Sequence, residues 1–308
     1  MKKILGILPH SIGGRLTTAS ILDGFAQNNY EIIIFDELKQ DNFSEYIEEK
    51  FDYIVGYDFS PIKLKIDNSL TFPCIAYFSD VIEDKTSGVG YKEYYKYLKE
   101  SDIYVFYWDR VLAKKNNLIY QPHFVNTKIY KNYQNPMTDV TFMGRLDTNL
   151  RLNMFLELNK MLPEVEFNYY GIKKHFDDAI LRCQNESDKK ILSKAYRGFI
   201  DNEIDMAKII NNTKIVYNIN AQGISSLNYR TFQTMACERL IISDYREELD
   251  LFENILPTYN NIDDLAEKIK YYLQNDIKYE SITKKSREFI ELNHDSFKCV
   301  KNMLDKIN

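Results

Sequence analysis

No stretch of this sequence is hydrophobic enough to cross a membrane, because none approaches the ~18 consecutive apolar residues that a spanning helix needs. The formal net charge is −5, so there is no general positive field, and we expect no nucleic-acid partner. Residues 1–14 contain only a short apolar run that enters a strand–turn–helix pattern, which favours a mature start over a signal peptide. We therefore expect a cytoplasmic protein.

Patterns for metal, disulfide and common nucleotide sites are missing as well. The four cysteines lie far apart without a C-x-x-C pair, and the four histidines show no ligand spacing. This spacing of the cysteines is typical of buried thiols in a reducing compartment. Neither G-x-G-x-x-G nor the P-loop pattern occurs, which argues against a dehydrogenase and a P-loop enzyme. We expect no cofactor.

What the sequence does contain is a series of short apolar runs separated by helical patterns. This alternation is typical of parallel strands covered by helices on both faces. The predicted strands are residues 3–8, 31–36, 51–56, 73–78, 102–107 and 117–120, then 139–144, 165–171, 196–200, 214–219 and 240–243. The polar segment 131–139 interrupts the alternation. With 308 residues, the chain is predicted to form two doubly wound α/β domains, residues 1–133 and 134–308.

Two predicted helices of the second domain begin with arginine, although the helix dipole already places positive charge there. Arg145 and Arg151 follow the strand at 139–144, and Arg230 lies at the start of the helix after Ser225. Each arginine alone is as well explained by a nearby carboxylate, such as Asp147 or Glu203. Three guanidinium groups beyond the carboxyl ends of strands in one domain instead favour a bound diphosphate.

The order of motifs in the second domain resembles that of GT-B glycosyltransferases of the spore-coat-maturation type, related to the glycosyl transferases group 1. The matching segments are VTFMGRLDTNLR, YRGFIDNEID, KIVYNIN and YRTFQTMACERLIISD. The resemblance covers about residues 139–308 and is looser over the first domain, in IVGYDFS, PCIAYFSD and YQPHFVNTKIY. It implies two Rossmann-like domains facing a cleft, with the C-terminal helix crossing back to the first domain.

Two residues depart from the family pattern. Gln233 stands where the family has a glutamate that accepts hydrogen bonds from the ribose of the donor, and an amide accepts such bonds more weakly. Glu238 stands where the family has a glycine, so we expect either a strained helix end or a different turn. Both departures put the identity of the donor in doubt.

The resemblance implies roles for individual residues. Arg145 and Arg230 would stabilise charge on the leaving nucleoside diphosphate, the work of a metal ion in the other main transferase fold. His10 is the candidate general base, and Asp80 is the competing carboxylate. A surface-loop histidine explains His10 at least as well. The expected donor contacts are Gly13, Gly14, Gly144, Arg151, Tyr170, Gly198, Phe199, Asn220, Ser225, Ser226, Asn228 and Gln233.

The sequence thus predicts an enzyme that transfers a sugar from a nucleotide-sugar donor to a hydroxyl of a bacterial surface glycan, glycolipid or glycoprotein. We expect it to be metal-independent, and the resemblance leans toward retention of the anomeric configuration. A sugar-nucleotide epimerase of the same fold and a non-catalytic nucleotide-sugar-binding subunit are the alternatives. Residues 91–100 mix lysines with tyrosines and glutamates, and packed tyrosines beneath a solvated face explain them better than peripheral contact with the inner face of the membrane.

Overall fold

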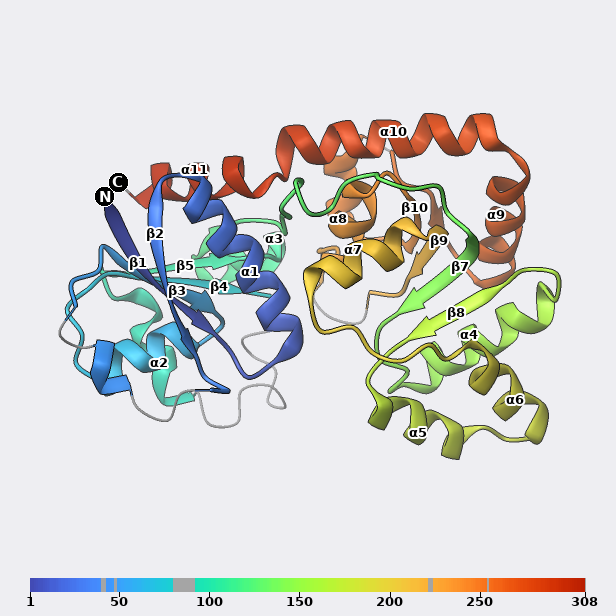
Figure 1. Ribbon diagram of the computed structural model, residues 1–308, viewed down its shortest axis with the longest axis horizontal. Coiled ribbons are helices and arrows are strands. Elements are labelled where there is room, and N and C mark those ends of the chain that lie inside the picture. Colours follow the sequence, from blue (N-terminus) through green and yellow to red (C-terminus); the bar gives the residue numbers. More distant parts are fainter. Residues whose placement is uncertain (40–42, 47–48, 80–91, 221–223, 254, 308) are drawn as a thin grey trace. The chain divides into compact units, whose positions relative to one another are not determined.

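The computed structural model describes residues 1–39, 43–46, 49–79, 92–220, 224–253 and 255–307, which form two compact units (Figure 1). Unit 1 contains Met1–Asn126, Gln222–Tyr229 and Leu292–Asn308, and unit 2 contains Thr127–Ala221 and Arg230–Glu291. The chain therefore passes between the units after residues 126, 221, 229 and 291. The single boundary predicted after residue 133 does not describe the two later segments that return to unit 1.

Unit 1 is built on a parallel sheet with the strand order β2-β1-β3-β4-β5-β6. The strands are β1 (Lys2–Leu8), β2 (Tyr30–Asp36), β3 (Tyr53–Tyr57), β4 (Cys74–Phe78), β5 (Ile103–Tyr107) and β6 (Ile119–Tyr120). Ile4 on β1 faces one hydrophobic core, and its neighbour Leu5 faces a second core on the opposite side of the sheet. Helices cover the sheet, which confirms the prediction made from the continuous apolar runs.

The helices of unit 1 include a pair formed by the two ends of the chain. The α-helices of this unit are α1 (Ile12–Gln27), α2 (Ser60–Asp67), α3 (Arg110–Asn116) and α11 (Ser296–Ile307). Helix α11 packs directly on α1. Gly24 permits this close approach, since a Cβ atom there would lie 2.4 Å from Cγ2 of Val300 and 2.6 Å from the carbonyl oxygen of Ser296. The prediction that the C-terminal helix returns to the first domain is confirmed.

Unit 2 has a parallel sheet with the strand order β11-β10-β9-β7-β8. The strands are β7 (Thr138–Met143), β8 (Phe167–Tyr170), β9 (Thr213–Asn218), β10 (Leu240–Asp244) and β11 (Thr258–Tyr259). From β7 the chain adds β8 on one side and later β9 on the other. The direction of winding therefore reverses between β7 and β9. In open α/β sheets this switch point is where ligands bind, beyond the carboxyl ends of the strands.

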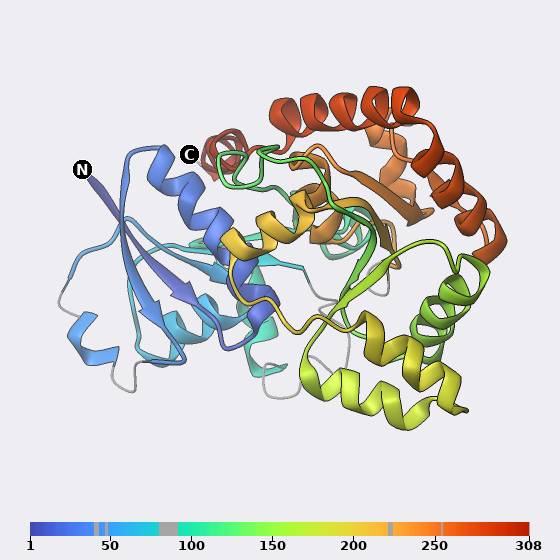
Figure 2. The ribbon, with the colours of Figure 1, turned by 45° about the vertical axis from the view of Figure 1, so that its right-hand side comes forward.

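Helices lie on both faces of this sheet, as Figure 2 shows, with α7 and α8 on one face and α4 and α9 on the other. The helices of unit 2 are α4 (Asn149–Met161), α5 (Lys173–Arg182), α6 (Glu186–Ala195), α7 (Glu203–Asn211), α8 (Tyr229–Ala236), α9 (Ile262–Gln274) and α10 (Asp276–Asn293). The first residue of α8 and the last two of α10 belong to unit 1. The two doubly wound α/β domains predicted from the sequence are confirmed.

One predicted strand is wrong. Residues 196–200 form no strand, and only Tyr196 makes an isolated bridge, to Tyr169. The reason is local, because Gly198 has φ +102°, which interrupts the regular ladder with β8 although its carbonyl still accepts a hydrogen bond from the N–H of Gly171. The short strand β11 was missed. The helical stretch predicted up to Lys194 is two helices, because Asn185 caps α6 by accepting a hydrogen bond from the N–H of Asp188 at 2.9 Å.

The expectation of a strained helix end at Glu238 is confirmed. Its φ is +57°, a left-handed conformation that favours glycine. The N–H of Arg239 donates to the carbonyl of Thr234, and the N–H of Glu238 donates to that of Met235, so α8 ends in the tight turn that such a residue allows. Glu238 thus adopts the backbone conformation that favours glycine, and it is strained in that conformation.

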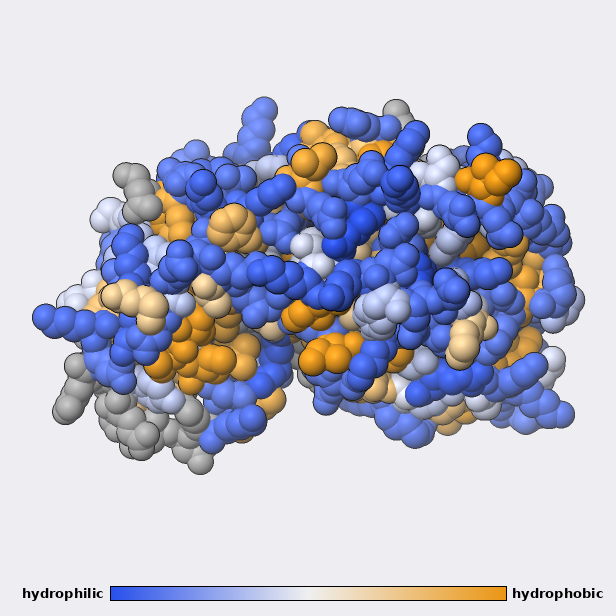
Figure 3. All heavy atoms as spheres, turned by 45° about the horizontal axis from the view of Figure 1, so that its top comes forward, coloured by the Kyte–Doolittle hydropathy of each residue, from blue (hydrophilic) through white to orange (hydrophobic). Residues whose placement is uncertain are grey.

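The visible face in Figure 3 is mostly hydrophilic, with hydrophobic side chains showing in several separate groups. Within the described ranges, no helix has both the length and the apolar character required to span a membrane.

Candidate functional site

Arg151 bridges the two loops at the switch point of unit 2. Its Nη1 donates to the carbonyl of Arg145, beyond β7, at 3.2 Å, and its Nη2 donates to the carbonyl of Ile219, beyond β9, at 2.9 Å. These are the strands between which the winding reverses. One guanidinium group therefore holds the two edges of the crevice where ligands bind in folds of this kind.

The local sequence explains how Arg151 reaches this place. Thr148 caps α4, and its side chain accepts from the N–H of Arg151 at 3.3 Å, so Arg151 lies in the first turn of the helix. Its side chain is only 12% exposed, and burial lowers the pKa of its guanidinium. Asp147 lies 3.6 Å from Arg151 Nη1 and 3.3 Å from Arg145 Nε. The Arg145 side chain is 50% exposed and is the guanidinium of this pair that is open to a ligand.

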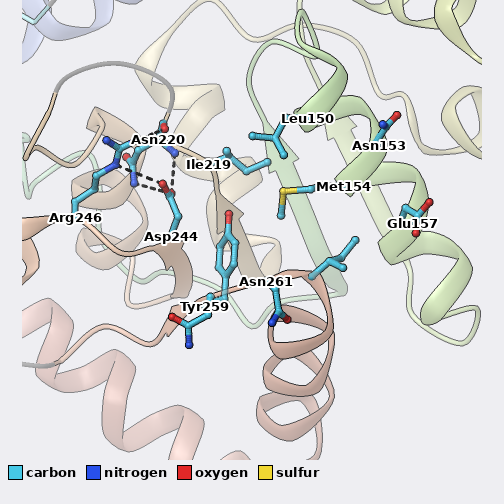
Figure 4. Close-up of a pocket in the computed structure, with 12 residues that line it drawn as sticks. Leu150, Asn153, Met154, Glu157, Ile219, Asn220, Asp244, Arg246, Tyr259 and Asn261 are labelled. Atoms are coloured by element: carbon cyan, nitrogen blue, oxygen red, sulfur yellow. Dashed lines mark hydrogen bonds and ion pairs between the residues drawn. The ribbon is translucent and has the colours of Figure 1, made fainter.

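A pocket of about 680 Å³ opens beside this bridge, entirely within unit 2 (Figure 4). One wall comes from α4, and the opposite wall comes from residues at or just beyond the carboxyl ends of β9, β10 and β11, together with the start of α9. The lining residues are Leu150, Asn153, Met154, Glu157, Ile219, Asn220, Asp244, Arg246, Tyr259, Asn260, Asn261 and Ile262. Leu150, Met154 and Ile219 are apolar, so the pocket combines apolar surface with a few polar groups, as small-molecule sites do.

Asn220, Asp244 and Arg246 form the polar wall of the pocket, as the dashed lines in Figure 4 show. Oδ1 of Asp244 accepts from the backbone N–H of Asn220 at 2.8 Å and from its Nδ2 at 2.9 Å. Nε of Arg246 lies 3.4 Å from Oδ2 of Asp244, and Nη2 of Arg246 donates to the carbonyl of Asn220. The predicted contact Asn220 is thus buried and held in place by a carboxylate and a guanidinium that the sequence reasoning did not select.

The structure also brings together predicted residues at the ends of β7 and β8. The N–H of Gly144 donates to the carbonyl of Tyr170 at 3.0 Å, and the N–H of Gly171 donates to the carbonyl of Gly198 at 2.9 Å. Phe199, next in the chain, is exposed. The carboxyl edge of the sheet that contains Arg145 and Asn220 therefore also contains Gly144, Tyr170, Gly198 and Phe199.

Arg230 and Gln233 interact with each other on α8. Nη1 of Arg230 donates to Oε1 of Gln233 at 2.6 Å and also meets Sδ of Met206. Arg230 is half-buried, whereas Gln233 is fully buried, with its Nε2 donating to the hydroxyl of Tyr130 at 2.5 Å. The structure gives Gln233 an internal role where we predicted a ribose contact, because no surface of its amide is exposed.

In unit 1, His10 lies in the loop after β1, and the two predicted glycines, Gly13 and Gly14, lie in the first turn of α1. The His10 side chain is exposed, and its backbone N–H donates to Glu37 at 3.1 Å. A Cβ at Gly14 would lie 2.5 Å from Ser11 Oγ, whereas a Cβ at Gly13 would meet nothing within 4 Å. Gly14 is therefore needed for local packing, and Gly13 leaves open space. The catalytic role of His10 stays a prediction.

This loop is anchored by an ion pair behind it. Nη1 and Nη2 of Arg15 donate to the two carboxylate oxygens of Asp36, each at 2.7 Å, and Nη1 also donates to the carbonyl of Pro9 at 3.3 Å. These hydrogen bonds from Arg15 lower the pKa of Asp36 to about 2. The ion pair thereby holds the backbone at Pro9, the residue before His10, close to Asp36 at the end of β2.

The segment before α8 does not place its serines at a ligand. Ser225 and Ser226 are fully buried in unit 1, where their hydroxyls donate to Asp109 and to the carbonyl of Trp108, each at 3.0 Å. The structure gives these serines a packing role where we predicted donor contacts. Asn228 is half-buried in the same segment. Asp80, the predicted carboxylate of the first domain, lies outside the described residues.

The residues that sequence reasoning missed are Asp109, Asp244, Arg246 and Tyr259. Asp244 had a visible signal, because it directly follows an apolar strand, in the same way as Asn220 follows its own. Asp109 had only the signal of a helix cap. Among the residues for which the structure gives positions, no His, Cys, Asp and Glu side chains gather into a group of three that could hold a metal ion.

A family model described as glycosyl transferase-like matches residues 151–305, half of the chain. The chain belongs to this glycosyltransferase family. The matched span includes Arg151, the polar wall of the pocket and all of α8. No curated protein sequence matches the chain significantly.

Solved structures show that the glycosyltransferase has the GT-B fold. Sucrose-phosphate synthase from Thermosynechococcus elongatus superposes with a TM-score of 0.71 at 11% identity, covering 99% of this chain and 98% of that chain. Anabaena HepE in complex with UDP and glucose gives 0.71 at 10% identity, with coverages of 100% and 99%. An alpha-glucosyltransferase in complex with UDP and a 13-mer DNA gives 0.73 at 12% identity, covering 99% of both chains.

Proposed function

We propose that this glycosyltransferase moves a sugar from a nucleotide-sugar donor to an acceptor hydroxyl, and that the donor binds at the switch point of unit 2. Complexes of HepE with UDP-glucose and of the alpha-glucosyltransferase with UDP support the choice of donor class. The acceptor in this proposal is a bacterial surface glycan, glycolipid or glycoprotein, a choice that rests on the family resemblance.

The observation that carries the proposal is the Arg151 bridge between the loops after β7 and β9. It fixes the crevice between Arg145 and Asn220 and leaves the Arg145 guanidinium exposed at its edge. A planar guanidinium pairs well with phosphate oxygens. We assign Arg145 to the diphosphate and the pocket beside Asn220 to the adjoining part of the donor.

Metal independence is part of the proposal. Guanidinium groups stabilise the negative charge that develops on a leaving diphosphate, which is the electrostatic task of a divalent cation in other transferases. Retention of the anomeric configuration is also proposed, on the family resemblance. Turnover in the presence of EDTA tests the first point, and the anomeric coupling in the proton NMR spectrum of the product tests the second.

The first experiment is a screen of UDP, ADP, GDP and CDP and their glucose conjugates for thermal stabilisation, since a ligand that binds only the folded state raises its stability. At least one is expected to stabilise the protein. Arg145→Ala should weaken the binding of that nucleotide by roughly tenfold or more, because it removes one hydrogen bond to a charged group. Lys285→Ala, an exposed change on α10, is the matched control for the lost positive charge.

Three results would redirect the assignment. Absence of binding for every nucleotide rejects the proposed donor class. A sugar nucleotide that is converted without an acceptor indicates an epimerase. Donor binding with neither transfer nor slow hydrolysis indicates a non-catalytic binding subunit.

A further inference from the structure

Every polar group of Asn220 is already engaged in the polar wall of the pocket. Its backbone N–H and its Nδ2 donate to Asp244, and its Oδ1 accepts from Nδ2 of Asn218 at 3.1 Å. Its carbonyl accepts from Nη2 of Arg246. Asn220 thus builds the wall, and the groups available to a ligand belong to other lining residues.

Asp244 uses one carboxylate oxygen for the wall and keeps the other open to the pocket. Oδ1 accepts the hydrogen bonds from Asn220, whereas in the described part of the chain Oδ2 accepts none. Oδ2 faces Nε of Arg246 at 3.4 Å, which is longer than a charge-assisted hydrogen bond. The Asp244 side chain is 26% exposed. Its Oδ2 is therefore an acceptor that the wall holds in one place.

The facing wall presents a second carboxylate. Leu150, Met154 and Glu157 follow one another at helical intervals, so one stripe of α4 lines the pocket, and Asn153 belongs to the same stripe (Figure 4). Asn153 and Glu157 are exposed, and among the described residues neither side chain makes a hydrogen bond. Both side chains can therefore bind a ligand without first losing a partner in the protein.

Apolar surface separates the two carboxylates. Figure 4 shows Ile219, Met154 and Tyr259 between Asp244 and Glu157. The hydroxyl of Tyr259 donates to the carbonyl of Asn218 at 2.9 Å, so its ring is what lines the pocket. A sugar ring has a C–H face that packs on such surface and hydroxyls at its edge that reach polar groups. The arrangement of the pocket is complementary to that shape.

The charges around the pocket favour a neutral ligand. Among the lining residues that the structure describes, Asp244 and Glu157 are two carboxylates against the one guanidinium of Arg246. The start of α9 offers no phosphate site, because Asn261 caps it by accepting from the N–H of Asp264 at 2.9 Å and Asp264 places a carboxylate in the first turn. A neutral group with several hydroxyls fits better here than an anion.

We propose that this pocket reads the hydroxyls of the donor, with Oδ2 of Asp244 and the carboxylate of Glu157 accepting hydrogen bonds from a neutral sugar ring. The inference rests on the proposed function, in which the pocket receives the part of the donor beside the diphosphate. The pocket adjoins the Arg151 bridge, because its lining residue Ile219 provides the carbonyl to which Arg151 donates. Two rings of a nucleotide sugar carry neighbouring hydroxyls, the ribose and the transferred sugar, and the test distinguishes them.

Glu157→Ala is the principal variant, since an exposed side chain can be removed without disturbing the fold. Titration calorimetry measures its affinities for UDP, 2′-deoxy-UDP, 3′-deoxy-UDP and UDP-glucose, or for the compounds of another base if the screen prefers it. If the ribose lies in the pocket, the wild type prefers UDP to a deoxy nucleotide by roughly tenfold, and the variant loses that preference. If the transferred sugar lies there, the variant loses roughly tenfold in affinity for UDP-glucose and binds UDP unchanged.

Two comparisons separate hydroxyl recognition from a loss of charge or of structure. Glu157→Gln keeps a neutral acceptor and should fall between the wild type and Glu157→Ala. Glu267→Ala, an exposed change on α9 outside the pocket, is the matched control and should leave every affinity unchanged. If the transferred sugar lies in the pocket, UDP-glucuronate should bind more weakly than UDP-glucose, and Glu157→Ala should narrow that difference.

Leu150→Trp is a second test that removes no polar group. Leu150 is 62% exposed and lines the pocket, so the larger ring should obstruct the space and weaken the same ligand as Glu157→Ala does. If UDP binds and neither variant changes any of these preferences, the inference is overturned while the proposed function stands. If the wild-type protein binds none of the nucleotides, the proposed function fails, and the inference fails with it.

Discussion

Asp109 is the buried carboxylate whose removal we expect to be most damaging to unit 1. Its Oδ2 accepts from the backbone N–H groups of Ile224, Ser225 and Ser226 at 2.7, 2.9 and 3.3 Å. Its Oδ1 accepts from the N–H of Leu112 and the hydroxyl of Ser225, each at 3.0 Å. One side chain therefore caps α3 and anchors the segment that leads into α8.

The expected loss of stability on replacing Asp109 follows from these contacts. Asp109→Ala leaves buried donors without an acceptor, and each such donor costs ~1–3 kcal/mol unless water replaces the carboxylate. Removal of one member of a buried charged network typically costs ~3–5 kcal/mol, and we expect a decrease of this size in the free energy of unfolding. Asp109→Asn must turn its NH₂ group toward one set of donors and should cost roughly 2–3 kcal/mol.

Trp108, the single tryptophan of the chain, is buried directly beside Asp109 and reports on unit 1. Urea unfolding followed by its fluorescence measures the effect. Ser225→Ala is the control: it removes one hydroxyl donor to Asp109 and a long hydrogen bond from the N–H of Val111 at 3.4 Å, and should cost about 1 kcal/mol. A loss below about 1 kcal/mol for Asp109→Ala, or a loss no larger than that of the control, would refute the reasoning.

The same site carries a pH dependence. Burial acts to raise the pKa of Asp109, but hydrogen bonds from the N–H groups of Leu112, Ser225 and Ile224 outweigh it and leave the pKa lowered. A lowered folded pKa means that the stabilisation is present above the unfolded value of about 3.9 and is lost as the pH falls below it. In Asp109→Asn this part of the acid sensitivity should disappear.

Three further predictions concern the fold. Glu238→Gly should raise the free energy of unfolding by about 1 kcal/mol, because its φ of +57° strains any residue except glycine; an unchanged urea midpoint would contradict this. Gly24→Ala should lower it by ~1–3 kcal/mol, since the new Cβ would overlap Val300, and a neutral result would show that α11 shifts freely on α1. Burial lowers the pKa of His123 to about 3, so the unfolded chain takes up a proton first and stability should fall as the pH drops from about 6.5 toward 3. When the urea midpoint is measured against pH, His123→Asn should reduce its decrease between about pH 6.5 and pH 3; an unchanged decrease would contradict this prediction.

Much of the fold was readable because it depends on local patterns. Continuous apolar runs such as residues 102–107 require burial on both faces, and α4 follows directly from its threonine cap and apolar spacing. At Glu238 the family's glycine left two alternatives, a strained helix end or a different turn, and the structure shows the first, with φ +57°.

Strand β11 and the irregular segment 196–200 were not readable in this way. A strand exists only if a neighbour accepts its hydrogen bonds, and a two-residue strand such as β11 has no periodicity to detect. Segment 196–200 has a strand-like composition, but the positive φ of Gly198 interrupts its ladder with β8.

The candidate site divides in a similar manner. The sequence placed Arg145, Arg151 and Asn220 beyond the carboxyl ends of strands, and the structure gathers all three at the switch point. The sequence did not indicate that Arg151 bridges two loops, because its second partner lies 68 residues away. The sequence also predicted Ser225 as a ligand contact, although its hydroxyl donates to the carboxylate of Asp109, 116 residues earlier in the chain.

By itself, then, the sequence determined the alternation of strands and helices, the two α/β units, the return of the C-terminal helix and the family. These features depend on local spacing and on the order of motifs along the chain. Only the tertiary structure decided which polar side chains face a ligand and which serve other side chains, as Gln233 serves Arg230 and Tyr130. The physical reason is that a buried polar group takes whichever partner the fold brings within about 3 Å, and that partner is set by packing between distant segments.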